Sequence, residues 1–270
     1  MVQGAFSKRS IHTPKITKLK ISIITVSFNS VNTIERTIKS VLQQNYSNIE
    51  YLVIDGGSTD GTISILEKYK INYISEPDNG IYDAMNKGII KSSGDVIGIL
   101  NSDDYYANEM IISSIVSIYK DSHESIGIVY SDLIFKDGEK IKRLYKGSSF
   151  KNSDFFYGLM PPHPTVFIKK IYYELHGLYR TDLSISADFE LLLRYMYINK
   201  INSKYFPCIS VVMSLGGISN KNWKSKVKLN EELIKAFKIN NIKVNYFKLF
   251  IKYLFRITEF ILPSVRANEN

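Results

Sequence analysis

Apolar residues follow two different periods along the first hundred positions of this chain. Apolar runs typical of strands cover four segments: Lys20–Phe28, Tyr51–Ile54, Asn72–Ser75 and Asp95–Leu100. Between them, apolar residues recur every three or four positions, which predicts helices. The expected inward faces of these helices are Ile34, Ile38, Val41 and Leu42, then Ile63, Leu66 and Tyr69, then Ile81, Ala84, Met85 and Ile89. This alternation predicts an α/β fold, with a mixed, mainly parallel sheet flanked by helices.

The pattern changes after residue 125. Further strands are predicted at Ile126–Phe135, Lys140–Tyr145, Thr165–Ile168 and Ile209–Leu215, and a helix at Asp188–Tyr197. A turn predicted between the first two of these strands favours antiparallel additions to the sheet. We therefore predict one compact domain over residues 20–217, with a flexible basic leader at 1–19 and an amphipathic helical region at 218–270.

The charge of the chain narrows the classes of partner. Its 270 residues carry a formal net charge of +9 and a pI near 9.3, which suits nucleic acids, anionic lipid surfaces or phosphorylated substrates. Nucleic acid is not expected, because the lysines gather in the C-terminal part without a recognition motif. The single cysteine, Cys208, excludes an intramolecular disulfide, and no apolar stretch reaches the ~20 residues of a membrane-spanning helix.

Two carboxylates follow the predicted buried strand that ends at Leu100. Sites in parallel sheets lie beyond the carboxyl ends of the strands, so Asp103 and Asp104 are well placed for chemistry. Mg²⁺ and Mn²⁺ prefer oxygen ligands, and Mg²⁺ is typically held by one or two carboxylates together with substrate phosphates. The alternative is an ordinary solvated turn, since Asn, Ser and Asp are common turn residues.

Several motifs occur in order along the chain: Ile23–Asn29, Val53–Thr62, Asn79–Gly88, Ser93–Asp95, Leu100–Asp104 and Ser186–Glu190. Together they resemble the motifs of family 2 glycosyltransferases, from about Ile21 to Ser219. The pattern looks most like bacterial transferases that build O-antigen, capsule or exopolysaccharide units. The resemblance implies a GT-A (Rossmann-like) fold, a nucleotide-sugar donor, a divalent metal (Mn²⁺ or Mg²⁺) and usually inversion at the anomeric carbon.

The resemblance also implies which residues bind the donor. Thr25, Ser27 and Asn29 would line the nucleotide pocket, and Asp55 would accept a hydrogen bond from a base N–H. Asn86 lies on a helix that family members tend to place against the nucleotide and ribose. From the residues alone, the same positions are strand, cap, turn and helix-packing residues.

The family motif around the metal is often Asp-x-Asp, with its last Asp as the direct ligand. By this resemblance Asp103 is the metal ligand. Asn101 stands where the first Asp is common, and it supplies no charge, but it can still bond a ribose hydroxyl or a metal-bound water. Asp104 is a second ligand, a supporting group or a solvated neighbour.

Asp188 is the candidate general base. Inverting transfer needs a carboxylate beside the acceptor hydroxyl, on the face opposite the leaving group. The position of Asp188 in the family motif favours this role over a plain N-terminal helix residue, and Glu190 is the second candidate. His163, fixed among three prolines, contacts acceptor or phosphate, or is structural.

The tail combines charge with apolar residues at helical spacing. Lys248, Lys252, Arg256 and Glu259 form one narrow stripe in the apolar segment Tyr246–Leu262. We predict that this helix lies in an anionic membrane interface, which would place the protein in the cytoplasm, peripheral at the inner face of the plasma membrane. The alternative is packing on the catalytic domain or on a second subunit, so an oligomer stays open.

These observations predict an inverting glycosyltransferase that moves a sugar from a nucleotide sugar, expected to be a UDP-sugar, to a hydroxyl of a saccharide or lipid-linked acceptor. One alternative is a sugar-phosphate nucleotidyltransferase, which would want a Gly-rich phosphate loop with basic residues that Ser27–Asn32 does not offer. The other is a non-catalytic nucleotide-sugar-binding scaffold at the membrane, against which the presence of both Asp103 and Asp188 argues.

Overall fold

The computed structural model describes residues 18–121, 125–148, 150–214 and 223–249. Its strands are β1 (Ile21–Ser27), β2 (Ile49–Asp55), β3 (Asn72–Ser75), β4 (Val96–Asn101), β5 (Tyr105–Tyr106), β6 (Ile128–Asp137), β7 (Lys140–Tyr145), β8 (Phe167–Lys169) and β9 (Ser203–Ser214). Its α-helices are α1 (Ile34–Leu42), α2 (Thr62–Lys68), α3 (Ile81–Lys91), α4 (Ile111–Asp121), α5 (Lys170–His176), α6 (Ala187–Leu192) and α7 (Trp223–Ile239). Two 3₁₀ helices at Asn152–Tyr157 and His163–Thr165, a π-helical stretch at Leu193–Ile198 and a helical turn at 246–249 complete the described elements.

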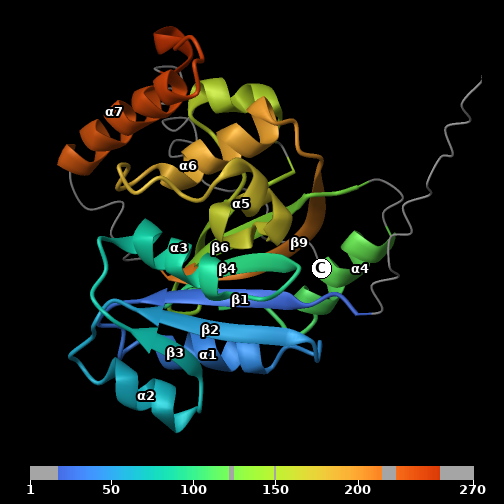
Figure 1. Ribbon diagram of the computed structural model, residues 1–270, viewed down its shortest axis with the longest axis vertical. Coiled ribbons are helices and arrows are strands. Elements are labelled where there is room, and N and C mark those ends of the chain that lie inside the picture. The colour runs from blue at the N-terminus through green and yellow to red at the C-terminus, as the bar shows by residue number, and fades with distance from the viewer. Residues whose placement is uncertain (1–17, 122–124, 149, 215–222, 250–270) are drawn as a thin grey trace, which may run out of the picture.

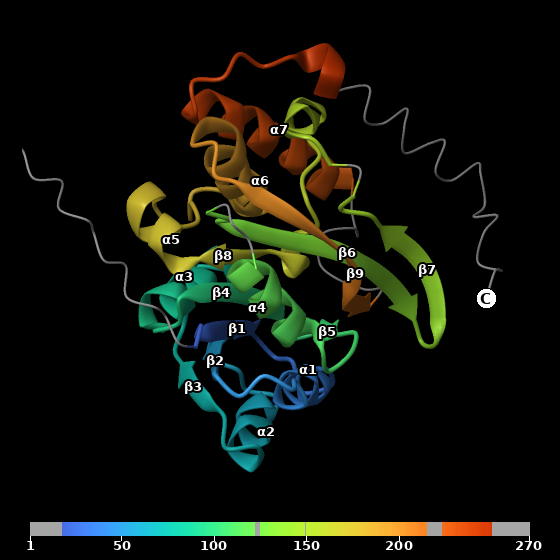
Figure 2. The same ribbon diagram turned by 90° about the vertical axis from the view of Figure 1, so that its right-hand side faces the viewer.

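The described strands form one mixed sheet in the order β3-β2-β1-β4-β8-β6-β9-β5, with β7 paired to β6 (Figure 1 and Figure 2). The first four are parallel, as the alternation of strands and helices predicted. The antiparallel additions are confirmed only in part: β8 runs against β4 and β6, and β7 runs against β6, but β6 pairs in parallel with β9. The β6–β7 hairpin extends from one side of the molecule (Figure 2). The predicted α/β class is therefore confirmed.

Alternate residues of β1 divide the core between the two faces of the sheet. Ile21 and Ile23 pack with the buried residues of α1, α2 and α4. Ile24 and Val26 pack with those of α3, α5, α6 and α7 on the opposite face. The period-2 alternation of a strand requires this division, and both faces are apolar because helices cover both.

The apolar face predicted for α1 is wrong at its last position. Ile34, Ile38 and Val41 are buried, but the Leu42 side chain is 53% exposed. Leu42 is the last residue of the helix and lies outside the stripe that the other three form. The pattern also did not indicate β5, α4 and α5, and the helix predicted at Asp188–Tyr197 passes from α-helical to π-helical geometry at Leu193.

The helix α7 packs on the same core as α6. Leu233, Ala236 and Phe237 are buried in the face that also holds Phe189. The division that we predicted at residue 217 falls outside the described residues, as do most of the leader at 1–19 and the tail beyond residue 249. Among the described residues, no helix is long and apolar enough to cross a membrane.

Gly88 lets α3 lie close to the sheet. A Cβ at this position would lie 2.4 Å from Ile24 Cγ2 and 3.2 Å from Ile54 Cγ1, and Ile24 is a stiff, fully buried β-branched residue. We expect G88A to lower the free energy of unfolding by about 1–2 kcal/mol, because overpacking outweighs the ~1 kcal/mol helix-propensity gain. Urea unfolding measures this, with K91A on the same helix as the exposed control. An unchanged or higher stability in G88A would contradict the close approach.

Candidate functional site

Three neighbouring strands end together at one edge of the sheet. In the strand register, Ser27 at the end of β1 pairs with Asp55 at the end of β2, and Val26 pairs with Asn101 at the end of β4. Three buried polar atoms in the described residues lack a hydrogen-bond partner: Ser27 Oγ, Asn101 Oδ1 and Asp104 Oδ1. Since buried polar groups are normally satisfied, their presence at this edge points to a polar ligand here.

The turn after β4 is held from beneath by α1. Thr37 Oγ1 donates to the carbonyl oxygens of Ser102 and Asp104, at 3.0 and 2.6 Å. Arg36 Nη2 donates to the carbonyl oxygen of Asp103 at 3.1 Å, and Ser30 Oγ lies 2.7 Å from Ser102 Oγ. The main chain of the turn is thus fixed, while no described residue forms a hydrogen bond or ion pair with the half-buried Asp103 carboxylate.

The oxygen atoms of this turn fit a hard divalent cation that also binds a phosphorylated ligand. Asp103 offers an uncommitted carboxylate, and Asn101 offers its unpaired Oδ1 while its Nδ2 donates to Asp104 Oδ2 at 3.0 Å. Burial raises the pKa of Asp104 well above its usual range, and the neighbouring Asp103 charge adds to this rise. No cluster of three His, Cys, Asp or Glu occurs in the described chain, so ligand oxygens would have to complete the coordination.

Asp55 and Asn29 shape the loops beside this edge. Asp55 Oδ2 accepts hydrogen bonds from the backbone N–H groups of Gly57 and Ser58 and from Ser75 Oγ, at 3.0, 2.8 and 2.8 Å. Asn29 adopts a left-handed φ of 48°, and its Oδ1 accepts the N–H of Thr59 at 2.9 Å. The two residues lie at the predicted end of the sheet, and they tie together the loops that follow β1 and β2.

Thr25 and Asn86 are buried and form hydrogen bonds within the protein. Thr25 is fully buried and its Oγ1 lies 3.2 Å from Tyr51 Oη, because β1 continues for two residues beyond it. Asn86 is also buried, and its side-chain amide exchanges two hydrogen bonds with the backbone of Tyr179, at 2.8 and 2.9 Å. In both cases groups of the protein bond the polar atoms, as they do in the buried Asp55, and the roles of Thr25 and Asn86 in donor binding stay predictions.

A second polar group forms around Asp188 at the start of α6. Tyr82, on α3, shares its hydroxyl between the carbonyl oxygen of Ile185 at 2.8 Å and Asp188 Oδ1 at 3.2 Å. His163 Nε2 lies 2.7 Å from Tyr179 Oη, and the Tyr179 ring stacks on that of Tyr82 at 5.7 Å between centroids. The predicted residues Asp188 and His163 thus belong to one cluster with two tyrosines.

Burial sets the protonation states in this cluster. Burial raises the pKa of Asp188, and the attraction of the nearby His163 opposes that rise only in part. Burial also lowers the pKa of His163, so the neutral imidazole is favoured near pH 7. A carboxylate whose pKa is raised toward the working pH is a better proton acceptor than an ordinary aspartate. The cluster is therefore suited to general-base chemistry.

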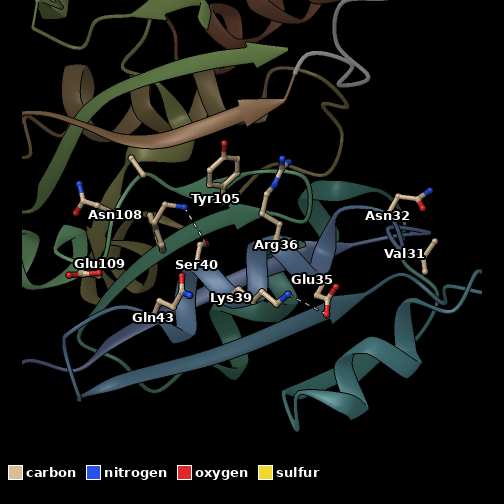
Figure 3. A pocket seen from close by; sticks show the side chains of 12 residues that line it. Val31, Asn32, Glu35, Arg36, Lys39, Ser40, Gln43, Tyr105, Asn108 and Glu109 are labelled. Carbon is tan, nitrogen blue, oxygen red and sulfur yellow. Dashed lines mark hydrogen bonds and ion pairs between the residues drawn. The ribbon is translucent and has the colours of Figure 1, made fainter. Parts of the chain in front are cut away.

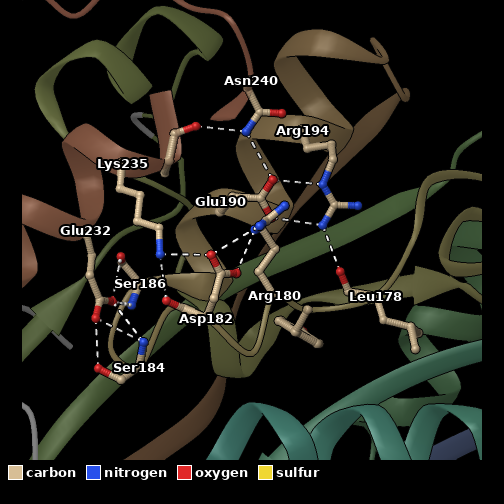
Figure 4. Close-up of polar contacts among 12 residues, drawn as sticks. Leu178, Arg180, Asp182, Ser184, Ser186, Glu190, Arg194, Glu232, Lys235 and Asn240 are labelled. Carbon is tan, nitrogen blue, oxygen red and sulfur yellow. Dashed lines mark hydrogen bonds and ion pairs between the residues drawn. The ribbon is translucent and has the colours of Figure 1, made fainter. Parts of the chain in front are cut away.

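Glu190, the second candidate for the base, is committed to a structural network. Its two carboxylate oxygens accept hydrogen bonds from Arg194 Nε and Nη2, both at 2.9 Å, and Asn240 Nδ2 donates to it at 3.0 Å (Figure 4). The side chain is only 1% exposed. This bidentate pair and the bond from Asn240 occupy both carboxylate oxygens of Glu190, which favours Asp188 over Glu190 as the candidate base.

The residues that hold the site in place were not predicted from the sequence. Arg36, Thr37 and Tyr82 act on the predicted residues across 67 to 106 positions of chain, and no local pattern announces such contacts. Conversely, Ser93–Asp95, one of the quoted motifs, lies at the opposite edge of the sheet, before β4. There Asp95 Oδ2 accepts the backbone N–H of Lys20 at 2.7 Å, so the motif closes the amino ends of two strands.

A groove of about 570 Å³ lies between α1 and the segment 105–109 (Figure 3). Its lining includes Arg36, whose guanidinium lies 4.3 Å from the centre of the Tyr105 ring. The groove contains none of the predicted site residues, and its Lys39 pairs with Glu35 at 3.6 Å. It borders the turn after β4 through Arg36 and Tyr105, but none of the residues with unpaired oxygens lines it.

Sequence comparisons identify relatives of this chain. Residues 22–174 match the sequence model of the family described as Glycosyl transferase family 2. An uncharacterized glycosyltransferase of Mycobacterium tuberculosis is 34% identical over 182 residues, which cover 64% of this chain and 68% of that protein. The chondroitin synthase of Pasteurella multocida is 24% identical over 215 residues, which cover 77% of this chain but only 22% of the synthase.

Solved structures share the fold. S. aureus TarS superimposes with a TM-score of 0.65 at 18% identity, over 92% of this chain and 46% of the TarS chain, so this chain spans less than half of that protein. The TarS 1–349 complex with UDP-GlcNAc gives 0.64. The mannosyltransferase PcManGT from Pyrobaculum calidifontis, in complex with GDP-Man and Mn²⁺, gives 0.63 at 14% identity, over 92% of this chain and 77% of that one. These likenesses establish the GT-A type of sheet that the motifs implied.

Proposed function

The chain belongs to glycosyl transferase family 2, and on that premise we propose that it is an inverting enzyme that moves a sugar from a UDP-sugar to a hydroxyl of a saccharide or lipid-linked acceptor. The observation that carries the proposal is the partly buried Asp188, which has a raised pKa and is held by Tyr82 at the start of α3. A transferase that inverts needs such a carboxylate, whereas a scaffold or a nucleotidyltransferase does not.

On the donor side, the turn after β4 would bind the diphosphate. Asp103 would hold a divalent cation, Asn101 Oδ1 would bond a ribose hydroxyl or a water on the cation, and Asp104 would support both from its buried position. When bound, the cation neutralises charge on the departing diphosphate. Ser27, with its unpaired hydroxyl, and the loops organised by Asn29 and Asp55 would contact the nucleoside.

On the acceptor side, Asp188 would take the proton of the acceptor hydroxyl as its oxygen attacks the anomeric carbon. The new bond joins the acceptor oxygen to that carbon, and the bond from the same carbon to the diphosphate oxygen breaks, so the nucleoside diphosphate leaves with the electron pair. Attack opposite the leaving group inverts the configuration. The neutral His163, bonded to Tyr179, would contact the acceptor.

A panel of nucleotide sugars tests the proposed reaction. We expect turnover with a UDP-sugar rather than a GDP- or dTDP-sugar, stimulated by Mn²⁺ or Mg²⁺, with an inverted anomeric configuration in the product. Release of the nucleoside diphosphate measures the first result, and nuclear magnetic resonance of the purified glycoside measures the second. A product that retains the donor configuration would overturn the role of Asp188 as the base.

We also propose that the enzyme works on bacterial surface polysaccharides, in the cytoplasm at the inner face of the plasma membrane. The support is the basic and aromatic segment Tyr246–Leu262. Of this segment, Tyr246 and Phe247 are 62% and 73% exposed and Leu249 is buried, while residues 250–262 lie outside the described chain. Two exposed aromatic rings beside lysines suit an anionic bilayer surface.

Vesicle binding tests this membrane proposal on the full chain. We expect sedimentation with anionic vesicles that weakens, without vanishing, as salt rises, because each basic residue contributes about 1 kcal/mol near an anionic leaflet and salt screens that attraction. The variant K252E/R256E keeps the buried Leu249 and should lose most of the binding while donor hydrolysis persists. A variant that sediments as well as the wild type would argue instead for packing or a second subunit.

A further inference from the structure

A carboxylate from α7 sits against the backbone that leads into Asp188. Glu232 Oε2 accepts the N–H groups of Ile185 at 2.8 Å and Ser186 at 3.0 Å, and Glu232 Oε1 accepts the N–H of Ser184 at 3.0 Å (Figure 4). The hydroxyls of Ser184 and Ser186 donate to the same carboxylate, at 2.8 and 3.2 Å. One buried side chain thus fixes three successive residues that end two positions before Asp188.

Two further residues of the same region hold the chain on either side of Asp188. Lys235 pairs with the Asp182 carboxylate at 2.8 Å and donates to its carbonyl oxygen at 2.9 Å. Asn240, just after α7, donates to Glu190 at 3.0 Å. The helix therefore contacts the segment from Asp182 to Glu190 at its start, at its middle and at its end.

The opposite side of this segment is held by α3. The Tyr82 hydroxyl reaches both the carbonyl oxygen of Ile185 and the Asp188 carboxylate, as described above. Ile185 is thus bonded through its N–H to Glu232 and through its carbonyl to Tyr82. Displacing the segment on one side would change the distance from Tyr82 to Asp188 on the other.

The charge of Glu232 matters as well as its shape. Burial by itself would raise the pKa of Glu232, but the hydrogen bonds from Ser184, Ile185 and Ser186 outweigh it and leave the pKa below its usual range. The side chain is therefore an anion near pH 7, and hydrogen bonds to an anion are stronger than those to a neutral amide. A glutamine would also turn an N–H₂ group toward backbone N–H donors.

We propose that Glu232 is a positioning residue for the general base: it holds Ser184–Ser186 so that the Asp188 carboxylate meets the acceptor hydroxyl. The proposal rests on the proposed function of Asp188 and extends it to α7. Both Asp188 and α7 lie beyond the matched family region, which ends at residue 174. Glu232 acts through Asp188 alone. Its replacement should therefore leave donor affinity unchanged, and it should not lower kcat further in a variant that already lacks the base.

The test begins with E232Q and a matched control, E231Q, on the exposed neighbouring position of α7. We expect E232Q to lower kcat for transfer to the acceptor by about 10- to 100-fold, because small displacements of a catalytic group have effects of this size. The dissociation constant for UDP-sugar should stay within about twofold of the wild type, and E231Q should leave both unchanged. Wild-type kcat in E232Q overturns the proposal.

A double-mutant cycle separates positioning from a general loss of structure. If Glu232 acts only through the base, E232Q/D188N is no slower than D188N, whereas independent effects multiply. Multiplied losses, or a donor affinity lowered together with kcat, would make Glu232 a merely structural residue. If E232Q does not fold, S184A replaces it in the double-mutant cycle, because this change removes one hydrogen bond to Glu232. We expect S184A to lower kcat about fivefold. If D188N is fully active, the proposed role of Asp188 as the base is wrong. If D188N loses activity but E232Q does not, only the proposed role of Glu232 is wrong.

Discussion

Replacement of Asp188 by asparagine should slow sugar transfer by about 10²–10⁴-fold, which is the usual contribution of a positioned general base. Asparagine keeps the shape of the side chain and leaves Tyr82 Oη an oxygen to bond, but it cannot accept the acceptor proton. Because the base touches the acceptor rather than the donor, the affinity for UDP-sugar should barely change. Initial rates with acceptor and calorimetry with donor measure the two quantities. Wild-type turnover, or a defect mainly in donor affinity, would show that the role is wrong.

The pH profile of the wild type gives an independent measure of the same residue. Asp188 must be ionised to act, and burial raises its pKa, so activity should fall at a higher pH than an ordinary aspartate would require as the solution is acidified. The acid limb of kcat/KM reports this group in the free enzyme. In D188N the remaining activity should lose that limb. Persistence of the limb in D188N would assign it to another group.

Replacement of Asp103 by alanine should lower metal-stimulated transfer by ~10²-fold or more, because even groups that only support a metal ligand contribute 10- to 100-fold. The backbone bonds from Arg36 and Thr37 to the turn remain, so the change removes one carboxylate and leaves the turn in place. Activity titrated with Mn²⁺, and donor affinity measured with and without the ion, should both lose their dependence on the metal.

The matched control for D103A is D137A, an exposed carboxylate in the β6–β7 hairpin that pairs with Lys142 at 3.4 Å. Exposed pairs contribute little, so this variant should behave like the wild type. Full activity of D103A in the presence of a chelator would overturn the metal role. A uniform loss with an unchanged Mn²⁺ titration would do so as well, because it would show damage to the turn rather than to a ligand.

The edge of the sheet was predictable because it follows from strand direction. Once β1, β2 and β4 are parallel, their final residues must meet, and Ser27, Asp55 and Asn101, which the family resemblance implied, lie at these strand ends. The two unpaired oxygens at Ser27 and Asn101 lie on these predicted residues. The exception is Thr25, which lies two residues before the end of β1, so that its side chain is buried rather than at the edge of the sheet.

The surroundings of Asp188 were not predictable, because they depend on contacts between distant segments. Asn86 reaches Tyr179 across 93 positions, and Glu232 reaches Ser186 across 46. A periodic pattern reports which face of a helix is buried, but it does not report what that face meets. The ion pair between Glu190 and Arg194 differs, because the two residues are four positions apart in sequence. Oppositely charged residues at that spacing predict a pair on a helix.

The packing of α7 on α6 has a consequence for engineering. Phe237 of α7 packs against Phe189, the residue directly after Asp188, with ring centroids 5.6 Å apart. A chimera that takes residues 182–190 from a relative while keeping its own residues 223–240 would therefore join two surfaces that were never selected together. Grafts intended to change acceptor preference should transfer both segments as one block, while the strands that carry the donor side stay with the recipient.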